Sequence, residues 1–130
     1  MTEPMAQFKI LCVDDDAVIR GVMSLILERQ GFQVRTAHNG PAGIKTALDW
    51  LPDLILMDLM MPVMDGFEAT AALRADPRTV HIPVVAFTTM NETNMQAKIQ
   101  AAGMDGMVPK LSPPRILVST LRTYLPPLAE

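Results

Sequence analysis

Residues 53–66 read DLILMDLMMPVMDG, and this stretch decides the fold that we predict for the chain. It opens with the apolar run Leu54–Met57, which has the length of a strand and carries no polar side chain on either face. A strand of this kind is typical of the middle of a parallel sheet that is covered on both sides. Asp58 follows directly, and after a short loop the sequence predicts a helix over Phe67–Ala75.

Outward from this stretch, strand-like runs alternate with segments of helical period. The further expected strands are Phe8–Val13, Phe32–Thr36, Val84–Phe87 and a short one at Met107–Pro109. The further expected helices are Asp16–Gln30, Asn39–Trp50, a segment around Met95–Ala102, and one that Ser112 caps and that ends near Tyr124. The evidence for the first of these helices is the spacing of its apolar residues Val18, Val22, Leu25 and Ile26.

Five strands that alternate with five helices predict an α/β fold, a doubly wound five-stranded parallel sheet with helices on both faces. The strands near Phe8, Leu54 and Val84 are apolar throughout, which places them in the middle of the sheet. The strand near Phe32 alternates polar and apolar residues, and the short strand near Met107 contains a proline, so both suit the edges. The expected strand order is 2-1-3-4-5, the flavodoxin-like order.

Polar side chains follow the expected strands at the point where each strand ends. They are Asp14, Asp15 and Asp16 after the first strand, Asp58 after the third, Thr88 and Thr89 after the fourth, and Lys110 after the fifth. In a sheet of this order, ligands bind beyond the carboxyl ends of the strands, where the strand order reverses. The sequence therefore predicts that carboxylates, a hydroxyl and an ammonium group meet at one edge of the sheet.

Such a cluster restricts the chemistry, because adjacent carboxylates repel one another and burial makes their ionisation costlier still. A hard divalent cation relieves this, and Mg²⁺ prefers oxygen ligands while it keeps several waters. We expect Asp14 and Asp15 to hold Mg²⁺ and Asp58 to attack a phosphoryl donor. Thr88 and Lys110 would then bind oxygens of the transferred group.

Each of these residues has a plainer interpretation when it is taken alone. Asp16 suits the N-cap of the helix that follows it. Asp58, Thr88 and Lys110 are each compatible with an ordinary turn or surface position. The functional interpretation depends on their convergence at the strand ends, since a motif gains specificity from its structural context.

Three stretches resemble the receiver domains of two-component response regulators. They are residues 10–16 (ILCVDDD), 53–66 and 82–88 (IPVVAFT). The resemblance runs from about Phe8 to about Leu125 and is most specific in the middle stretch. It implies a single receiver domain over 1–130, with a core of about 8–125 and no effector domain.

The resemblance also implies a role for each site residue. Asp58 would be the phosphoacceptor, and Asp14 and Asp15 would bind Mg²⁺ together with Asp58 and the backbone carbonyl of Met60. Thr88 and Lys110 would be the switch residues that contact the phosphoryl group. The donor would be a phosphohistidine on a sensor histidine kinase or a histidine phosphotransfer protein, and phosphorylation would shift the face made by the fourth helix, fifth strand and fifth helix. Met90 and Met107 are candidates for this output face.

The chain departs from the family pattern around Lys110. The family usually has proline after this lysine, often with a cis bond, whereas here Leu111 follows and Pro109 precedes. A cis bond before a residue other than proline costs about 2.5–4 kcal/mol, so we expect Lys110–Leu111 to be trans. Met107 stands where the family often has an aromatic residue that rotates inward, so we expect that readout to be absent or blunted.

Composition narrows the class of protein further. The chain has 130 residues, a formal net charge of −3 and one cysteine, Cys12. The acidic balance argues against nucleic-acid binding, which depends on Lys and Arg. No apolar run is long enough to span a membrane and no signal peptide is recognisable, so we expect a cytoplasmic protein, monomeric or weakly dimeric.

The expected function is that of a stand-alone response regulator, which takes a phosphoryl group onto Asp58 and then binds a downstream protein. It would be a phosphoacceptor and switch, not an enzyme. Two alternatives keep the fold: a phosphorelay intermediate that passes the group to a histidine phosphotransfer protein, and a scaffold that is never phosphorylated. Two others change the class. A flavin-binding domain is disfavoured by the aspartates after the first strand, and a metal-dependent phosphatase by Met60, where an acid or base is usual.

Overall fold

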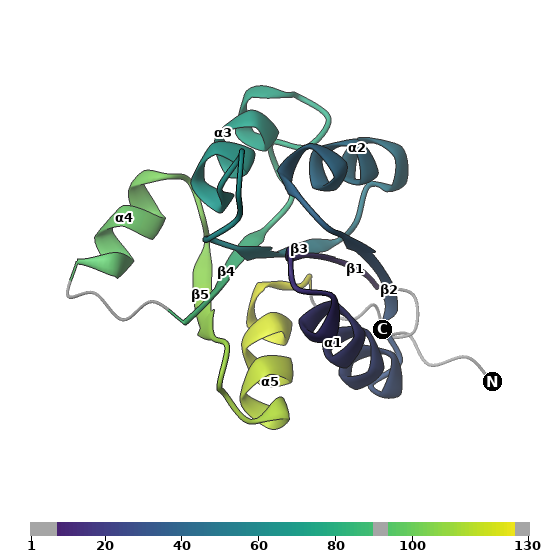
Figure 1. Cartoon of the computed structure of the whole chain (residues 1–130). Coiled ribbons are helices and arrows are strands. Elements are labelled where there is room, and N and C mark those ends of the chain that lie inside the picture. Colours follow the sequence, from purple (N-terminus) through teal and green to yellow (C-terminus); the bar gives the residue numbers. More distant parts are fainter. Residues whose placement is uncertain (1–7, 90–93, 127–130) are drawn as a thin grey trace.

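A five-stranded parallel sheet in the order β2-β1-β3-β4-β5 organises the chain, as the sequence predicted (Figure 1). The structure is a computed structural model, and it describes residues 8–89 and 94–126. The strands are β1 (Lys9–Val13), β2 (Gln33–Ala37), β3 (Leu54–Asp58), β4 (Val84–Thr88) and β5 (Gly106–Pro109). The helices are α1 (Ala17–Arg29), α2 (Gly40–Trp50), α3 (Gly66–Ala75), α4 (Met95–Ala101) and α5 (Pro114–Tyr124).

The helices cover the sheet in two layers. Helices α1 and α5 lie side by side on one face, and α2, α3 and α4 cover the other (Figure 1). Because successive strand residues point to opposite faces, the central strands supply both cores. In β1, Ile10 and Cys12 pack towards α1 and α5, whereas Leu11 and Val13 pack towards the other layer. This double covering is the flavodoxin-like arrangement predicted from the apolar central strands.

The two edge strands are the more exposed ones, as predicted. In β2 only Ala37 is buried, and Gln33, Arg35 and Thr36 are exposed. In β5 Val108 is buried, and Pro109 is exposed at the end of the strand. No helix of the described part of the chain has the length and apolarity needed to cross a bilayer.

Side chains fix the starts of three helices. Asp16 caps α1 by accepting hydrogen bonds from the backbone N–H groups of Val18 at 2.9 Å and Ile19 at 3.3 Å, which confirms its predicted capping role. Asn39 caps α2 in the same way. Asp65 and Glu68 form a reciprocal capping box at the start of α3.

The predicted cap of the last helix is wrong. We expected Ser112 to cap it with Pro113 just inside, but Pro113 itself occupies the N-cap position and α5 begins at Pro114. No side chain caps this helix. Proline is tolerated at the first helical position because the N–H group that it lacks would have no partner inside the helix.

Helix α1 turns an apolar stripe outward. Val18, Val22 and Leu25, which signalled the helix in the sequence, are exposed, whereas Met23 and Leu27 are buried against the sheet. The spacing therefore predicted the helix correctly without indicating which side of it faces the core.

Gly21 and Gly66 give a matched pair of glycine-to-alanine tests. A Cβ at Gly21, in exposed α1, would meet nothing within 4 Å, so Gly21→Ala should raise the free energy of unfolding by up to about 1 kcal/mol. A Cβ at Gly66 would collide with the backbone carbonyl oxygen of Asp58 and lie 3.0 Å from Leu59 Cα. Gly66→Ala should therefore lower the free energy of unfolding by at least about 2 kcal/mol. Urea unfolding followed by circular dichroism measures both, and equal effects would contradict the close approach.

Candidate functional site

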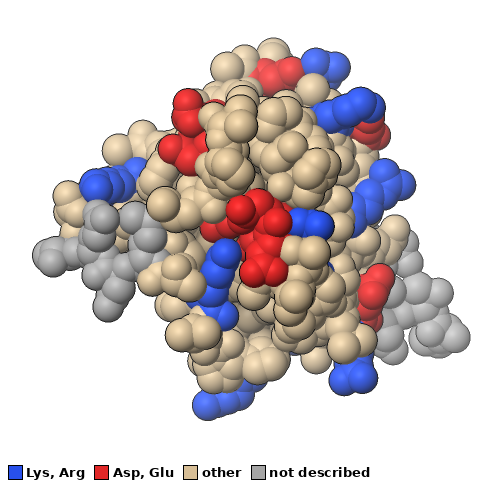
Figure 2. Space-filling model, in the orientation of Figure 1, with Lys and Arg blue, Asp and Glu red and all other residues tan. Residues whose placement is uncertain are grey.

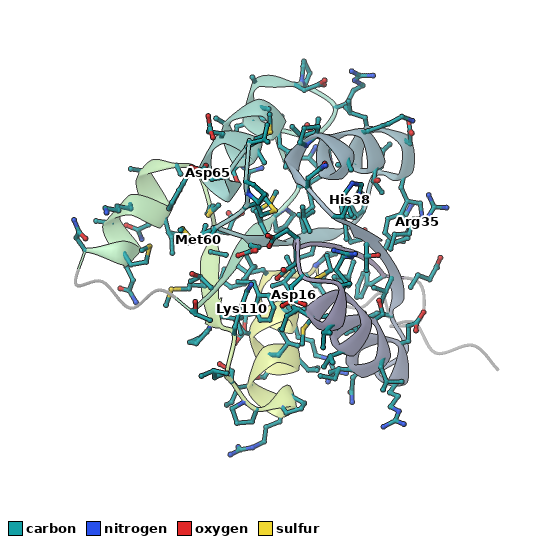
Figure 3. All side chains as sticks on the ribbon, viewed as in Figure 1. Asp16, Arg35, His38, Met60, Asp65 and Lys110 are labelled. Carbon is teal, nitrogen blue, oxygen red and sulfur yellow. The ribbon has the colours of Figure 1, made fainter. Side chains whose placement is uncertain are left out.

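The polar residues singled out in the sequence meet at the carboxyl ends of the central strands. Asp14 and Asp15 directly follow β1, Asp58 and Thr88 are the last residues of β3 and β4, and Lys110 directly follows β5. Carboxylate oxygens of Asp14, Asp15 and Asp58 lie within 4.8 Å of one another. Figure 2 shows a red patch with blue atoms beside it in the middle of the visible face, and Figure 3 labels Asp16 and Lys110 in the same part of that view.

Lys110 is the cation of this cluster. Its Nζ lies 2.8 Å from Asp14 Oδ2 and 3.3 Å from Asp58 Oδ1, and 5.6 Å from the centre of the Phe87 ring. Its backbone N–H donates to the Thr88 carbonyl at 3.0 Å, which ties the start of this loop to β4. The departure from the family pattern after Lys110 therefore leaves its ammonium in the site.

The backbone at Lys110–Leu111 agrees with the prediction. No peptide bond between described residues is cis, so the bond before Leu111 is trans. The turn that follows is closed by a hydrogen bond from Ser112 N–H to the Pro109 carbonyl at 3.0 Å.

The surroundings of Asp58 disfavour the ionisation of its carboxyl group. The residue is 2% exposed, and burial together with the nearby Asp14 carboxylate raises its pKa to about 6. The Lys110 ammonium and the Met60 N–H, which donates to Asp58 Oδ1 at 3.2 Å, act in the opposite direction. Asp58 is consequently ionised at neutral pH but is poorly stabilised as an anion.

Two buried carboxylate oxygens lack a hydrogen bond. Asp14 Oδ1 accepts from the Asp16 N–H at 2.9 Å, but Asp14 Oδ2 and Asp58 Oδ2 accept no hydrogen bond from any described residue. Lys110 faces Asp14 Oδ2 as a close charge, without the angle of a hydrogen bond. Buried oxygens of this kind, beside the exposed Asp15 carboxylate, fit a hard divalent cation such as Mg²⁺.

Arg20 belongs to the surroundings of the site, although the sequence analysis did not single it out. From α1 its Nη1 donates to the backbone carbonyl of Asp14 at 2.8 Å. This bond fixes the backbone of the acidic loop between β1 and α1. The sequence did contain a signal for this contact. Arg20 is a basic residue four positions, or one helical turn, after the helix cap Asp16.

The remaining predicted residues are placed as follows. Thr88 is buried at the end of β4. Met60, two residues past Asp58, has an exposed side chain, and Met107 is half-buried on β5 opposite Ala86. Met90 lies outside the described residues. The role of Met107 in a readout stays a prediction.

The loop after Asp58 contains a strained residue. Val63 has a φ of 71° and is 97% exposed, and the Met64 N–H donates across it to the Pro62 carbonyl at 2.8 Å. A β-branched residue seldom adopts positive φ, and the three-residue turn of this hand is rare and strained. Backbone strain therefore lies in the loop that runs from Asp58 to α3.

Comparison with known proteins agrees with this geometry. The family model for the response regulator receiver domain matches residues 10–122. The chain belongs to this family. Its acidic cluster and Lys110 lie at the carboxyl ends of the strands, where the expected strand order had predicted a ligand site.

The curated proteins that are similar to this chain are of several kinds. The chain is 40% identical over 104 residues to the DNA-binding dual master transcriptional regulator RpaA of Synechocystis, covering 78% of this chain and 42% of that protein. It is 35% identical to the phosphate regulon transcriptional regulatory protein PhoB of Pseudomonas aeruginosa, covering 89% and 51%. Protein PilH of P. aeruginosa is 40% identical, covering 65% and 69%. The chain thus spans about half the length of the first two relatives.

Solved structures match about nine tenths of the chain. The chemotaxis protein CheY4 of Vibrio cholerae superimposes with a TM-score of 0.87 at 33% identity, covering 91% of this chain and 98% of that one. The receiver domain of the sensor histidine kinase PA1611 from P. aeruginosa gives a TM-score of 0.83 at 28% identity, covering 90% and 96%. The latter structure has a magnesium ion coordinated in its active-site cleft.

The raised pKa of Asp58 makes stability depend on pH. Below its ordinary pKa of 3.8 the carboxyl is largely protonated in the folded and unfolded states alike; as pH rises from there to about 6, the folded state loses stability because it disfavours the anion. Asp58→Asn removes this cost and should stabilise the receiver domain at pH 7.5 by up to about 3 kcal/mol, but by less than about 1 kcal/mol at pH 4. Urea unfolding without divalent cations at both pH values measures the difference.

The control for this experiment is Asp49→Asn, which removes an exposed carboxylate paired with Lys45 on α2. An exposed pair contributes little, so this variant should stay within about 0.5 kcal/mol of the unmodified chain at both pH values. A variant Asp58→Asn that is less stable than the unmodified chain at pH 7.5 would contradict the assigned electrostatics.

Strain at Val63 predicts an unusual response to glycine. Val63→Gly relieves positive φ, whereas Val80→Gly, at another exposed valine without positive φ, loosens the unfolded chain and also removes a side chain that is about half buried. The first variant should therefore be more stable than the second by at least about 1 kcal/mol in thermal unfolding. Equal melting temperatures would show that the turn at Val63 carries no strain.

Proposed function

We propose that the chain is a phosphorylation switch that takes a phosphoryl group from a phosphohistidine onto Asp58. The observation that carries this proposal is the setting of Asp58, a buried carboxylate with one oxygen lacking a hydrogen bond, between two further carboxylates and a lysine. The donor would be a sensor histidine kinase or a histidine phosphotransfer protein, and the reader of the switched surface would be a downstream protein.

Asp58 would act as the nucleophile. A carboxyl with a pKa of about 6 is ionised at neutral pH, so one of its oxygens attacks the phosphorus atom. The new P–O bond forms as the P–N bond of the phosphohistidine breaks, and the electron pair returns to the imidazole. Weak stabilisation of the anion in the resting site favours a reaction that moves its charge onto the phosphoryl oxygens.

The other site residues would receive that charge. Lys110, held 3.3 Å from Asp58 Oδ1, would pair with a phosphoryl oxygen as a point charge. Asp14, Asp15, Asp58 and the backbone carbonyl of Met60 would hold Mg²⁺, and the ion supplies neutralisation of the negative charge on the transferring group.

Thr88 would convert phosphorylation into a change of surface. It is buried at the end of β4, and its carbonyl accepts the hydrogen bond from the Lys110 N–H. A Thr88 hydroxyl drawn towards a phosphoryl oxygen would therefore disturb the start of the loop between β5 and α5. We propose that the face formed by α4, β5 and α5, including Met107, transmits the signal.

The deciding experiment is phosphorylation by a small-molecule donor. Incubation with acetyl phosphate and Mg²⁺ should add the mass of one phosphoryl group to the intact chain. Removal of Mg²⁺ by EDTA should abolish the adduct, and Asp58→Asn should not form it. Asp49→Asn, which keeps the site intact, serves as the matched control and should be labelled like the unmodified chain.

Three results would overturn the proposal. Labelling of Asp58→Asn would move the acceptor elsewhere in the chain. A folded chain that is not labelled at any donor concentration would indicate a receiver-like scaffold instead. Continued release of inorganic phosphate from a generic phosphate ester would indicate a phosphatase, because a phosphoacceptor switch has no such turnover.

A further inference from the structure

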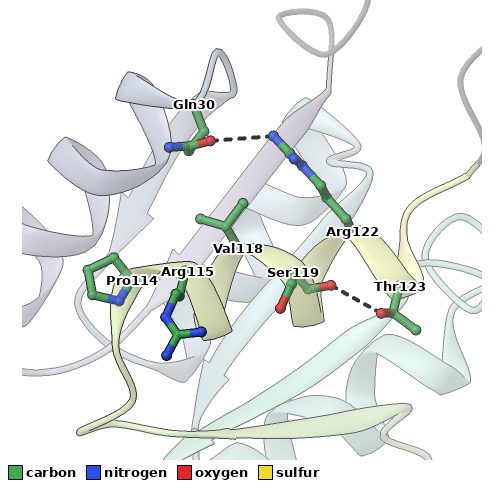
Figure 4. A pocket seen from close by; sticks show the side chains of 7 residues that line it. All are labelled: Gln30, Pro114, Arg115, Val118, Ser119, Arg122 and Thr123. Atoms are coloured by element: carbon green, nitrogen blue, oxygen red, sulfur yellow. Dashed lines mark hydrogen bonds between the residues drawn. The ribbon is translucent and has the colours of Figure 1, made fainter.

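An open groove lies between the end of α1 and α5 (Figure 4), on the side of the sheet away from α4 (Figure 1). Its volume is about 610 Å³, within the range of ligand and peptide sites in proteins. It is lined by Gln30 and, from α5, by Pro114, Arg115, Val118, Ser119, Arg122 and Thr123. None of these residues belongs to the phosphoacceptor site.

Two arginines give the groove its charge. Arg115 and Arg122 are exposed, and neither has an acidic partner among the described residues. Arg122 Nη2 lies 3.4 Å from Gln30 Oε1, a neutral acceptor, and Arg115 makes no hydrogen bond or ion pair within the described chain. Arg122 lies seven positions after Arg115, which corresponds to two helical turns, or about 10 Å along the helix axis.

The charge of this region is opposite to that of the whole chain. The stretch 106–126 contains Lys110, Arg115 and Arg122 and no Asp or Glu, whereas the chain as a whole has a net charge of −3. Asp14 and Asp58 compensate Lys110. Within residues 8–89 and 94–126, Arg115 and Arg122 remain as positive charges without an acidic partner on one helix face.

The groove lining between the two arginines is apolar or already hydrogen-bonded within its own helix. Val118 lies between them in Figure 4 and is almost completely buried, so it forms an apolar floor. The hydroxyls of Ser119 and Thr123 donate to carbonyls of their own helix, at 3.2 Å and 3.1 Å. Recognition in the groove would therefore rest on the two guanidinium groups and on an apolar contact between them.

We propose that this groove docks an acidic amphipathic helix of a partner protein. Carboxylates seven residues apart on such a helix match the spacing of Arg115 and Arg122, and each guanidinium can bind a carboxylate through two parallel hydrogen bonds. An apolar side chain between the carboxylates packs on Val118, as in other helix-in-groove complexes. A nucleic acid fits less well, because two arginines on an acidic domain neutralise too few phosphates.

The test uses the full chain and two synthetic helical peptides of about five turns. One peptide has glutamates seven residues apart with leucines between them, and its matched counterpart has lysines at the glutamate positions. In ¹H–¹⁵N correlation spectra the acidic peptide should shift the amides of Gln30, Val118, Ser119 and Arg122. Affinity should fall at least about tenfold in the double variant Arg115→Glu/Arg122→Glu, and it should weaken as salt is added.

Two controls separate this proposal from the proposed function. Lys45→Glu reverses an exposed charge on α2, across the sheet, and should leave the affinity unchanged. Asp58→Asn should also bind the acidic peptide like the unmodified chain, because the groove contains no residue of the phosphoacceptor site. Failure of phosphorylation would thus leave this result intact, and failure of docking would leave phosphorylation intact.

Several outcomes would overturn the docking proposal. They are equal binding of the lysine peptide, absence of binding by the acidic peptide, and shifts confined to α4 and β5. Dimerisation of the chain that Arg115→Glu/Arg122→Glu abolishes would assign the groove to a second copy. Charge-dependent binding to vesicles of phosphatidylglycerol that the same variant abolishes would assign it to an anionic membrane surface.

Discussion

The structure depends on an unequal balance of charge at one edge of the sheet. Two buried carboxylates, Asp14 and Asp58, share the single ammonium group of Lys110, and the Asp15 carboxylate adds further negative charge nearby. Parallel strands bring these residues together because their carboxyl ends meet at one edge. The site consequently carries more negative than positive charge. A bound divalent cation, or the loss of the negative charge of Asp58, would reduce this excess.

The surrounding backbone holds this unfavourable cluster in place. Arg20 fixes the loop after β1 through the Asp14 carbonyl, and Gly66 lets the start of α3 approach the Asp58 carbonyl more closely than any side chain would permit. The positive φ of Val63 lies in the same loop. Backbone strain persists only where the neighbouring structure maintains it. Here the contact of Arg20 holds the loop after β1, and the close approach of Gly66 holds the loop after β3.

The fold places the site around Asp58 and the groove between α1 and α5 on different parts of the surface. Lys110 joins the proposed phosphorylation site to β4 through its backbone and begins the connection to α5, so a change at Asp58 would have a short route to that helix. The groove between α1 and α5 lies on the other side of the sheet from α4, with its own two arginines. One domain therefore has room for a phosphorylation-dependent surface and a second surface with a different charge.

Sequence by itself determined the strand order, the double covering of the sheet and the gathering of Asp14, Asp15, Asp58, Thr88 and Lys110. These features follow from local period and from the residues that end each strand, which any parallel sheet brings to one edge. Only the tertiary structure decided that Pro113 displaces Ser112 as the N-cap of α5 and that Val18 and Val22 face outward. It also decided the partner of Arg20, the raised pKa of Asp58 and the groove beside Arg115. These depend on how closely side chains from distant segments approach and how much water they exclude, and no local pattern records either quantity.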